Sequence, residues 1–267
     1  MKRLTQIHLE HNDDIDNAVE RFGDHEGMSH AKVLRWLEQF PDEELSLAIE
    51  VVRSIRYYGS ANVRAMTKQL FQIVTAELQD RELARAVFVA VGRTGAGSAM
   101  VVRVLRELVR GTVHKVATML EVAQLQPGAV DAIVFLDDFS GTGDTLTSWW
   151  ETVESIVRPS NAAVFIGLLV LNEKARPKLE QFGDVLSVTE LGGEANVLAE
   201  ESRAFSETQK EILLERCRRT KCGPRYEKGY GECGLLVVLK HGCPNNSLPI
   251  LWYESSTWRS LFSRRAI

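Results

Sequence analysis

The sequence lacks long hydrophobic runs and has little excess charge of either sign. None of its apolar stretches approaches the roughly 20 residues that a membrane-spanning helix needs, and the N-terminal stretch MKRLTQIHLEHNDDID has no apolar segment typical of a signal peptide. The net charge of −4 provides no general attraction to nucleic acid or to anionic lipid. We therefore expect a cytoplasmic protein with no membrane partner and no strong nucleic-acid signature.

Cysteine is scarce and unevenly distributed. All the cysteines lie in the last fifth of the chain, at Cys217, Cys222, Cys233 and Cys243. Structural zinc sites usually contain pairs of cysteines separated by two to four residues, and the spacings here are wider. Free, mostly buried thiols are the expected state in a reducing compartment, and a zinc site is the alternative.

The period of the apolar residues changes near residue 85. Before it, apolar residues recur at helical spacing, in the segments 29–40, 42–58 and 61–78. Ser29 is suited to cap the first of these helices. Trp36 and Phe40 could face a partner, but core packing is favoured because large aromatic side chains are mostly buried. We expect an N-terminal helical region over residues 1–84.

After residue 85, apolar runs alternate with helical segments. The runs are AVFVAVG, AIVFLDD, AAVFIGLLVLN and DVLSVTEL. Strands that are hydrophobic on both faces belong in a parallel sheet covered by helices. The predicted fold class is therefore α/β, with a doubly wound parallel sheet over residues 85–204. Residues 205–267 should add a helix that begins with a capping box at Ser206 and Gln209, a strand and an irregular terminus.

Two loops follow strands at the edge where open α/β sheets bind ligands. The first contains Arg93, Thr94, Gly95, Ala96 and Gly97. Its glycines allow the main chain to approach an anion, and Arg93 offers a planar guanidinium to phosphate oxygens. A tight turn from strand to helix also favours glycine, so a purely structural role is the alternative.

The second loop lies within AIVFLDDFSGTGDTL, residues 132–146, and leads into a helix. Its residues are Ser140, Gly141, Thr142, Gly143, Asp144 and Thr145. Backbone amides at the helix start, together with the threonine hydroxyls, can bind a phosphate group. The lysine of a Walker A loop is missing, which argues against ATP hydrolysis of that type.

Asp137 and Asp138 end the strand before this loop. Adjacent carboxylates repel each other unless hydroxyl donors or a cation face them. Ribose hydroxyls and Mg²⁺ both meet this need, and a phosphate site beside the acids would suit a ribose 5-phosphate. The alternative is that both aspartates simply solvate the strand end.

Residues 132–146 resemble the signature of the type I phosphoribosyltransferase superfamily, in which a hydrophobic strand and two acids precede T-G-x-T. The resemblance implies that Asp137 and Asp138 bind the ribose hydroxyls of phosphoribosyl pyrophosphate and hold Mg²⁺ as catalytic residues. It also implies that residues 142–145 bind the 5-phosphate and residues 93–97 the pyrophosphate.

A narrower resemblance extends over most of the chain. WLEQF at 36–40, DDFSGTGDTL, GYGECGLLVVLKHGCPNNSLPILW at 229–252 and a final W-x-x-LF-x-R are similar to the PRTase-CE family of bacterial conflict systems. This resemblance implies an anti-phage effector, with a retron reverse transcriptase complex or a second copy of the chain as partner. It places Asn245 and Asn246 in a hood over the ligand, although CPNNSLP also reads as an ordinary turn.

Several residues depart from purine-salvage enzymes. Gly141 stands where those enzymes often carry an acid, and Lys115 is the one cation offered between residues 113 and 131. Asp144 is unfavourable beside a phosphate unless its side chain turns toward a cation or a free N–H. Catalysis is therefore left open. The alternatives are a housekeeping nucleobase or orotate-type transferase and a non-catalytic nucleotide sensor that binds a partner.

Overall fold

A computed structural model describes residues 2–92 and 97–264 of the chain. These residues form two compact units, one from Met1–Ser60 together with Gly193–Ile267 and the other from Ala61–Gly192. Among the described residues, no helix has the length and apolar character needed to cross a membrane.

The second unit contains a five-stranded parallel sheet in the order β3-β2-β4-β5-β6. The strands are β2 (Ala86–Ala90), β3 (Lys115–Ala117), β4 (Ala132–Ser140), β5 (Ala163–Asn172) and β6 (Asp184–Leu191). Its helices are α5 (Ser60–Asp80), α6 (Gly97–Leu108), α7 (Met119–Val122), α8 (Asp144–Val157) and α9 (Arg176–Leu179), with 3-10 turns at Arg158–Ser160 and Glu173–Ala175. The predicted α/β class with a parallel sheet is confirmed.

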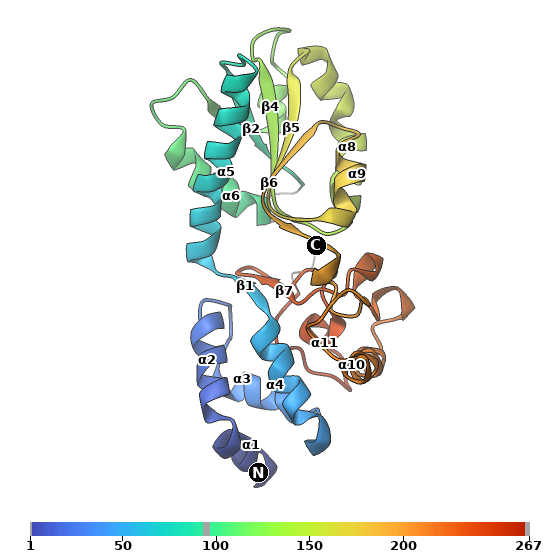
Figure 1. The fold of residues 1–267 in the computed structure, drawn as a ribbon. Helices are drawn as coiled ribbons and strands as arrows, with labels where there is room; N and C mark the ends of the chain where they lie inside the picture. Colours follow the sequence, from blue (N-terminus) through green and yellow to red (C-terminus); the bar gives the residue numbers. More distant parts are fainter. Residues whose placement is uncertain (1, 93–96, 265–267) are drawn as a thin grey trace. The chain divides into compact units, whose positions relative to one another are not determined.

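Helices cover both faces of this sheet, with α5 and α6 on one side and α8 and α9 on the other (Figure 1). On the α8 side, Trp150 and Phe135 belong to one buried cluster that also contains residues of α9. Trp150 is therefore a core residue. On the α5 side, the rings of Phe71 and Phe88 lie 5.8 Å apart. Apolar contacts on both faces explain why the central strands have no polar alternation.

The first unit combines both ends of the chain. Its helices are α1 (Lys2–Glu10), α2 (Asn12–Phe22), α3 (His30–Leu37), α4 (Leu45–Ser54), α10 (Glu207–Arg219) and α11 (Pro249–Trp252). Its strands β1 (Arg56–Tyr58) and β7 (Val237–Leu239) form a parallel pair. Single 3-10 turns lie at Asp42–Glu44, Gly193–Ala195, Pro224–Tyr226 and Tyr230–Glu232.

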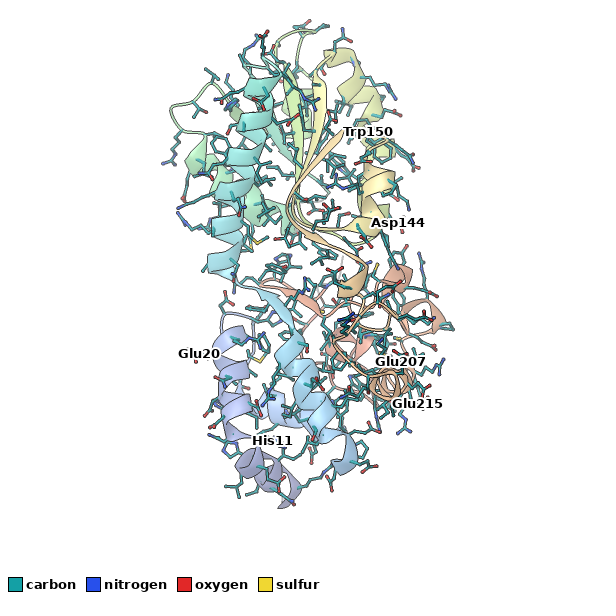
Figure 2. All side chains as sticks on the ribbon, viewed as in Figure 1. His11, Glu20, Asp144, Trp150, Glu207 and Glu215 are labelled. Carbon is teal, nitrogen blue, oxygen red and sulfur yellow. The ribbon has the colours of Figure 1, made fainter. Side chains whose placement is uncertain are left out.

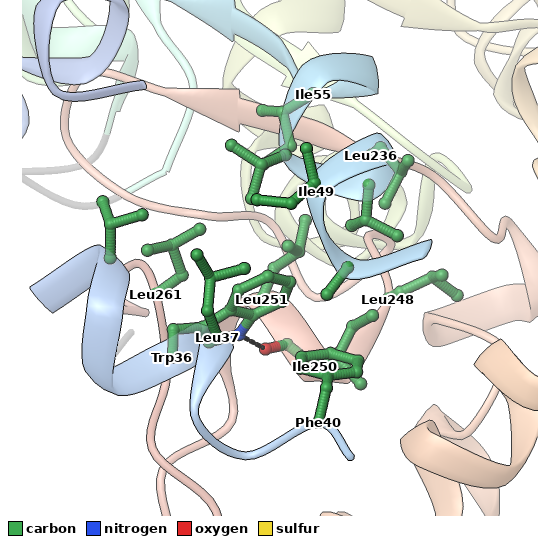
Figure 3. Packing of buried hydrophobic residues seen from close by; sticks show 14 of the residues in the cluster. Trp36, Leu37, Phe40, Ile49, Ile55, Leu236, Leu248, Ile250, Leu251 and Leu261 are labelled. Atoms are coloured by element: carbon green, nitrogen blue, oxygen red, sulfur yellow. Dashed lines mark hydrogen bonds between the residues drawn. The ribbon is translucent and has the colours of Figure 1, made fainter. Parts of the chain in front are cut away.

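One hydrophobic core joins the N-terminal and C-terminal parts of this unit (Figure 3). Trp36 and Phe40 are fully buried in it, which confirms the prediction of core packing. The indole Nε1 of Trp36 donates a hydrogen bond to the carbonyl oxygen of Ile250 at 2.7 Å, and Nε1 of Trp258 donates to the same oxygen at 3.0 Å. Two distant segments of the sequence are thus joined at one acceptor.

The unit boundaries differ from those expected at residues 84 and 204. Helix α5 belongs with the sheet, because Phe71 packs on Phe88 and a Cβ built at Gly167 would lie 3.4 Å from Leu70 Cδ2. The helices before residue 60 instead share their core with residues after 193. Local periodicity predicted α3, α4 and α5, although residues 56–58 of the second expected helix form strand β1 instead. It does not reveal which partner buries the apolar stripe of a helix.

Helix caps agree with the sequence at two places. The Ser29 side chain accepts a hydrogen bond from the Lys32 amide at the start of α3, and Ser206 and Gln209 form a reciprocal capping box at the start of α10. Both caps satisfy amides that would otherwise lack an intrahelical partner.

Candidate functional site

The sheet order places side by side the two strands that precede the candidate loops. Strands β2 and β4 are neighbours, but the chain leaves β2 toward β3 on one side and leaves β4 toward β5 on the other. Such a topological switch point is where open α/β sheets bind ligands, beyond the carboxyl ends of the strands. The end of β2 and the loop between β4 and α8 therefore lie at the ligand-binding edge of this unit.

Strand β4 extends beyond β2 and carries the two acids at its end. Its pairing with β2 stops at Leu136, whereas its pairing with β5 continues through Asp137 to Ser140. Asp137 is half-buried, and Asp138 is 6% exposed. The two carboxylates are thus held on a strand that is rigidly paired on one side.

The two acids are not equivalent. Successive side chains of a strand point to opposite faces, so Asp138 shares the α6 face of β4 and Asp137 shares the α8 face. The position of Asp138 agrees with this, because a Cβ built at Gly97, the first residue of α6, would lie 2.1 Å from its Oδ2 atom. Glycine is therefore required at residue 97 to let the helix start approach the carboxylate.

Asp137 bonds back to the strand. Its Oδ1 atom accepts a hydrogen bond from the Asp138 amide at 3.0 Å. Burial, and then the neighbouring charge of Asp138, hold the pKa of Asp137 well above its ordinary value. A cation or hydroxyl donors bound at this carboxylate would stabilise its charged form and so offset the effect of burial and of the neighbouring charge.

The loop after β4 turns sharply into α8. Gly143 has φ of +80°, a left-handed conformation that favours glycine, and it precedes the first helical residue, Asp144. A Cβ built there would lie 3.3 Å from Leu179 Cδ2 and 3.4 Å from the Ala175 carbonyl oxygen, so the turn rests on the α9 segment. Thr145, in the first turn of the helix, is exposed. This arrangement presents a helix start suited to binding an anion.

Asp144 turns toward a lysine. Its carboxylate forms an ion pair with the Lys178 ammonium and accepts a hydrogen bond from Thr142 Oγ1 at 3.0 Å. Figure 2 labels Asp144 at the start of α8. The ion pair supplies the cation that the sequence requires if Asp144 is to lie beside a phosphate.

Lys178 was not identified from the sequence. It lies in α9, just beyond β5, the strand that neighbours β4. Its position at the carboxyl edge of the sheet is the signal that could have revealed it, because residues following adjacent parallel strands meet at one edge. The segment ARPKL shows no motif by itself.

The remaining predicted residues fall into two groups. Arg93, Thr94, Gly95 and Ala96 lie outside the described residues. Asn245 and Asn246 lie in the other unit.

The two asparagines bond within their own unit. The Asn245 carbonyl oxygen accepts from the Tyr230 amide at 2.7 Å, and Asn246 Nδ2 donates to the Tyr230 carbonyl oxygen at 3.0 Å. Asn246 is 6% exposed. These contacts account for CPNNSLP as a structural turn without requiring a ligand.

The side-chain donors of the chain limit the kind of metal site that it can form. In the described part of the chain, no three or more His, Cys, Asp or Glu side chains converge to hold a metal ion, and the four cysteines are buried free thiols. Mg²⁺ is usually held by one or two carboxylates together with water and substrate phosphates. The paired oxygens of Asp137 and Asp138, and the raised pKa of Asp137, fit a site of that kind.

Comparisons with known proteins found similar solved structures and one matching family. The chain is similar to the structure of HGPRT-ase from Leishmania tarentolae in complex with GMP, with 16% identity over 52% of this chain and 83% of that one and a TM-score of 0.35. It is also similar to the hypoxanthine-guanine phosphoribosyltransferase of Schistosoma mansoni, with 16% identity over 51% of this chain and 65% of that one and a TM-score of 0.35. No curated protein matches it in sequence.

A family model gives the wider match. It covers residues 33–264, which begin within α3 and include the later helices, the sheet and the C-terminal segment. The chain therefore belongs to the PRTase-CE family and has a phosphoribosyltransferase-like fold.

Proposed function

We propose that the protein binds a phosphoribosyl ligand, either phosphoribosyl pyrophosphate or a nucleotide, together with Mg²⁺. The observation that carries this proposal is the junction of β4 and α8, where two carboxylates and a glycine turn meet a helix start at the switch point of the sheet. Amides of residues 143–145 would hold the 5-phosphate. Asp137 and Asp138 would face the ribose diol and Mg²⁺.

The chemistry available to such a ligand is displacement at the ribose anomeric carbon. A nucleophile would form a bond to that carbon as the bond to the pyrophosphate oxygen breaks, and the electron pair would leave with pyrophosphate. Mg²⁺ supplies charge neutralisation on the leaving group when it is bound. The residues of this chain would hold the sugar in one orientation for the reaction.

A ligand-binding role without turnover is the second candidate. Gly141 is buried in the loop and supplies no acid or base, and Lys115 is exposed at the start of β3. Both features support a nucleotide sensor over a purine-salvage enzyme. Among transfer reactions, they favour one in which the nucleophile needs no general base at position 141.

Binding and turnover can be tested together. Calorimetric titration with phosphoribosyl pyrophosphate should show binding that strengthens with Mg²⁺ and is lost in the Asp137→Asn, Asp138→Asn variant. Asp184→Asn is the matched control, because Asp184 begins β6 at the opposite edge of the sheet. Pyrophosphate release in the presence of candidate acceptors would identify an enzyme, and binding without release would identify a sensor. Unchanged affinity in the double variant would refute the site.

We also infer, from membership of the PRTase-CE family, that the protein acts in bacterial defence against phage, as the effector of a retron-type system with a reverse transcriptase complex as partner. Plaque assays in cells that carry the whole gene neighbourhood test this role. Protection should be lost with Asp137→Asn, Asp138→Asn and retained with Asp184→Asn. Equal protection by all the variants would separate any defence role from the phosphoribosyl site.

A further inference from the structure

We propose that the open edge of β3, together with the exposed face of α6, is a docking surface for an acidic polypeptide segment in extended conformation. Strand β3 is the outermost strand of the sheet and pairs with β2 along one side. In the described part of the chain, no strand pairs with its other side. That side offers backbone N–H and C=O groups that an added strand can bond.

Arginines line the neighbouring helix. Arg103, Arg106 and Arg110 recur at helical spacing on or just after α6, all three are exposed, and the face opposite them is the buried one. Within the described residues, no ion pair involves these three side chains. Seven residues of helix span about 10 Å. The acid on the same face, Glu107, is paired with Arg64, so the three guanidinium groups leave a net positive stripe rather than a point charge.

The stripe reaches the segment that follows β3. The charge of Arg106 contributes to lowering the pKa of Glu121, after the hydrogen bonds that Glu121 makes with Thr118 at the α7 cap. Helix α6 also packs directly against β3, so its arginines lie on an element that adjoins the open strand. Lys115, at the start of the strand, is exposed and adds a further positive charge.

Apolar side chains bracket the same strand. Val113 is 65% exposed just before β3, and Leu120 is 71% exposed just after it. Single exposed apolar residues are common on protein surfaces. Here, however, two of the three large hydrophobic side chains that the described residues expose lie on either side of one open strand. They provide apolar contacts for alternate side chains of a strand added there.

These features favour a polypeptide over a nucleic acid. Residues 97–122 contain no Phe, Tyr or Trp, so the surface lacks the aromatic platforms on which single-stranded bases stack. A nucleic acid also leaves the backbone N–H and C=O groups of the open strand edge without hydrogen bonds, whereas an added peptide strand forms hydrogen bonds with them. Charge complementarity to the arginine stripe requires the peptide to be acidic.

The test uses a displayed library of random dodecapeptides selected against the whole protein. The surface should enrich peptides in which acidic residues alternate with β-branched ones. Hydrogen exchange with a synthetic copy of the best peptide should show new protection at residues 115–117. Arg103→Glu, Arg106→Glu, Arg110→Glu should weaken its binding about tenfold, because three attractive charge contacts with the acidic peptide become repulsive.

Controls separate this surface from general charge effects. Arg203→Glu, Lys221→Glu, Arg259→Glu makes the same change in net charge at exposed residues of the other unit and should leave affinity unchanged. Val113→Ser, Leu120→Ser removes the apolar contacts without touching the charges and should also weaken binding.

Three outcomes would overturn the proposal. The first is enrichment without acidic bias, the second is protection elsewhere than β3, and the third is equal loss of affinity in the control variant. Tighter binding of oligothymidylate than of any peptide, lost on reversal of the three α6 arginines, would instead make the surface a nucleic-acid site. Each outcome is read on the intact chain, and thermal unfolding confirms that every variant is folded.

Discussion

The Lys178 ammonium pairs with the Asp144 carboxylate at the first turn of α8. The positive charge of Lys178 balances the negative charge of Asp144. Without it, this carboxylate would repel an anion bound at the amides of the loop. Asp144 also accepts from Thr142 Oγ1 at 3.0 Å, so the ion pair fixes the direction of a loop hydroxyl. The anion-binding capacity of the loop therefore depends on a residue from α9.

Replacing Lys178 with methionine should weaken phosphate binding. The change removes the cation that balances the charge of Asp144 near the site, and the cost should be about tenfold in the dissociation constant of ribose 5-phosphate, since partly exposed charge pairs contribute up to roughly 1 kcal/mol and removal adds repulsion of the anion. Calorimetry measures the change. The double variant Asp144→Asn, Lys178→Met removes both charges and should recover most of the affinity. Failure to recover would contradict electrostatic balancing.

The contact between Gly97 and Asp138 predicts a steric effect. Gly97→Ala would place Cβ about 2 Å from the carboxylate of a buried residue, and overpacking of this kind typically costs 1–3 kcal/mol, so we expect a loss of roughly that size in unfolding free energy. Chemical denaturation followed by circular dichroism measures it. Asp138→Ala in the same chain should relieve the clash, so the two changes should be strongly non-additive. Additive losses would argue against this close approach.

The raised pKa of Asp137 predicts a pH dependence of stability. The folded protein retains a proton on this group at pH values where the unfolded chain has released it, so stability should fall as pH rises above the ordinary aspartate value of 3.8. The Asp137→Asn variant lacks this titrating group, so its stability should fall less steeply as the pH rises. Thermal melts of both proteins between acid and neutral pH compare the slopes. Parallel curves would show that Asp137 does not titrate abnormally.

The shared carbonyl oxygen of Ile250 predicts coupling between two tryptophans. Trp36→Phe or Trp258→Phe alone leaves the oxygen with one indole donor, so each should cost about 1 kcal/mol beyond packing losses. The double variant leaves a buried acceptor without either donor and should cost more than the sum, by roughly 1–3 kcal/mol. Denaturant unfolding of the four proteins provides the cycle. Simple additivity would mean that water replaces the donors.

Much of the fold could be predicted from local patterns. Apolar runs such as that ending at Leu136 identified the parallel sheet, because strands covered on both faces need no polar alternation. Caps at Ser29 and Ser206 were predicted because side-chain capping depends on adjacent residues. The division into units could not be predicted in this way, because it depends on which distant segment buries each helix.

The candidate site was predictable in part for the same reason. The order of acids and glycines from Asp137 to Gly143 lies in one continuous stretch, so sequence alone indicated a phosphate and sugar site. Lys178 comes from another strand end and carries no local motif. The two aspartates differ in their surroundings because successive strand residues alternate between faces, yet the charge of Asp138 still acts on Asp137, so the two carboxylates lie close enough to serve one ligand.

The core that joins Trp36 to Ile250 affects the order in which the protein can form during synthesis. Residues 61–192 contain every strand of the five-stranded sheet and can begin to fold as soon as they leave the ribosome. The first sixty residues must wait with apolar side chains exposed until the last segment emerges. We therefore expect the nascent N-terminal helices to be the part of the chain that chaperones bind longest.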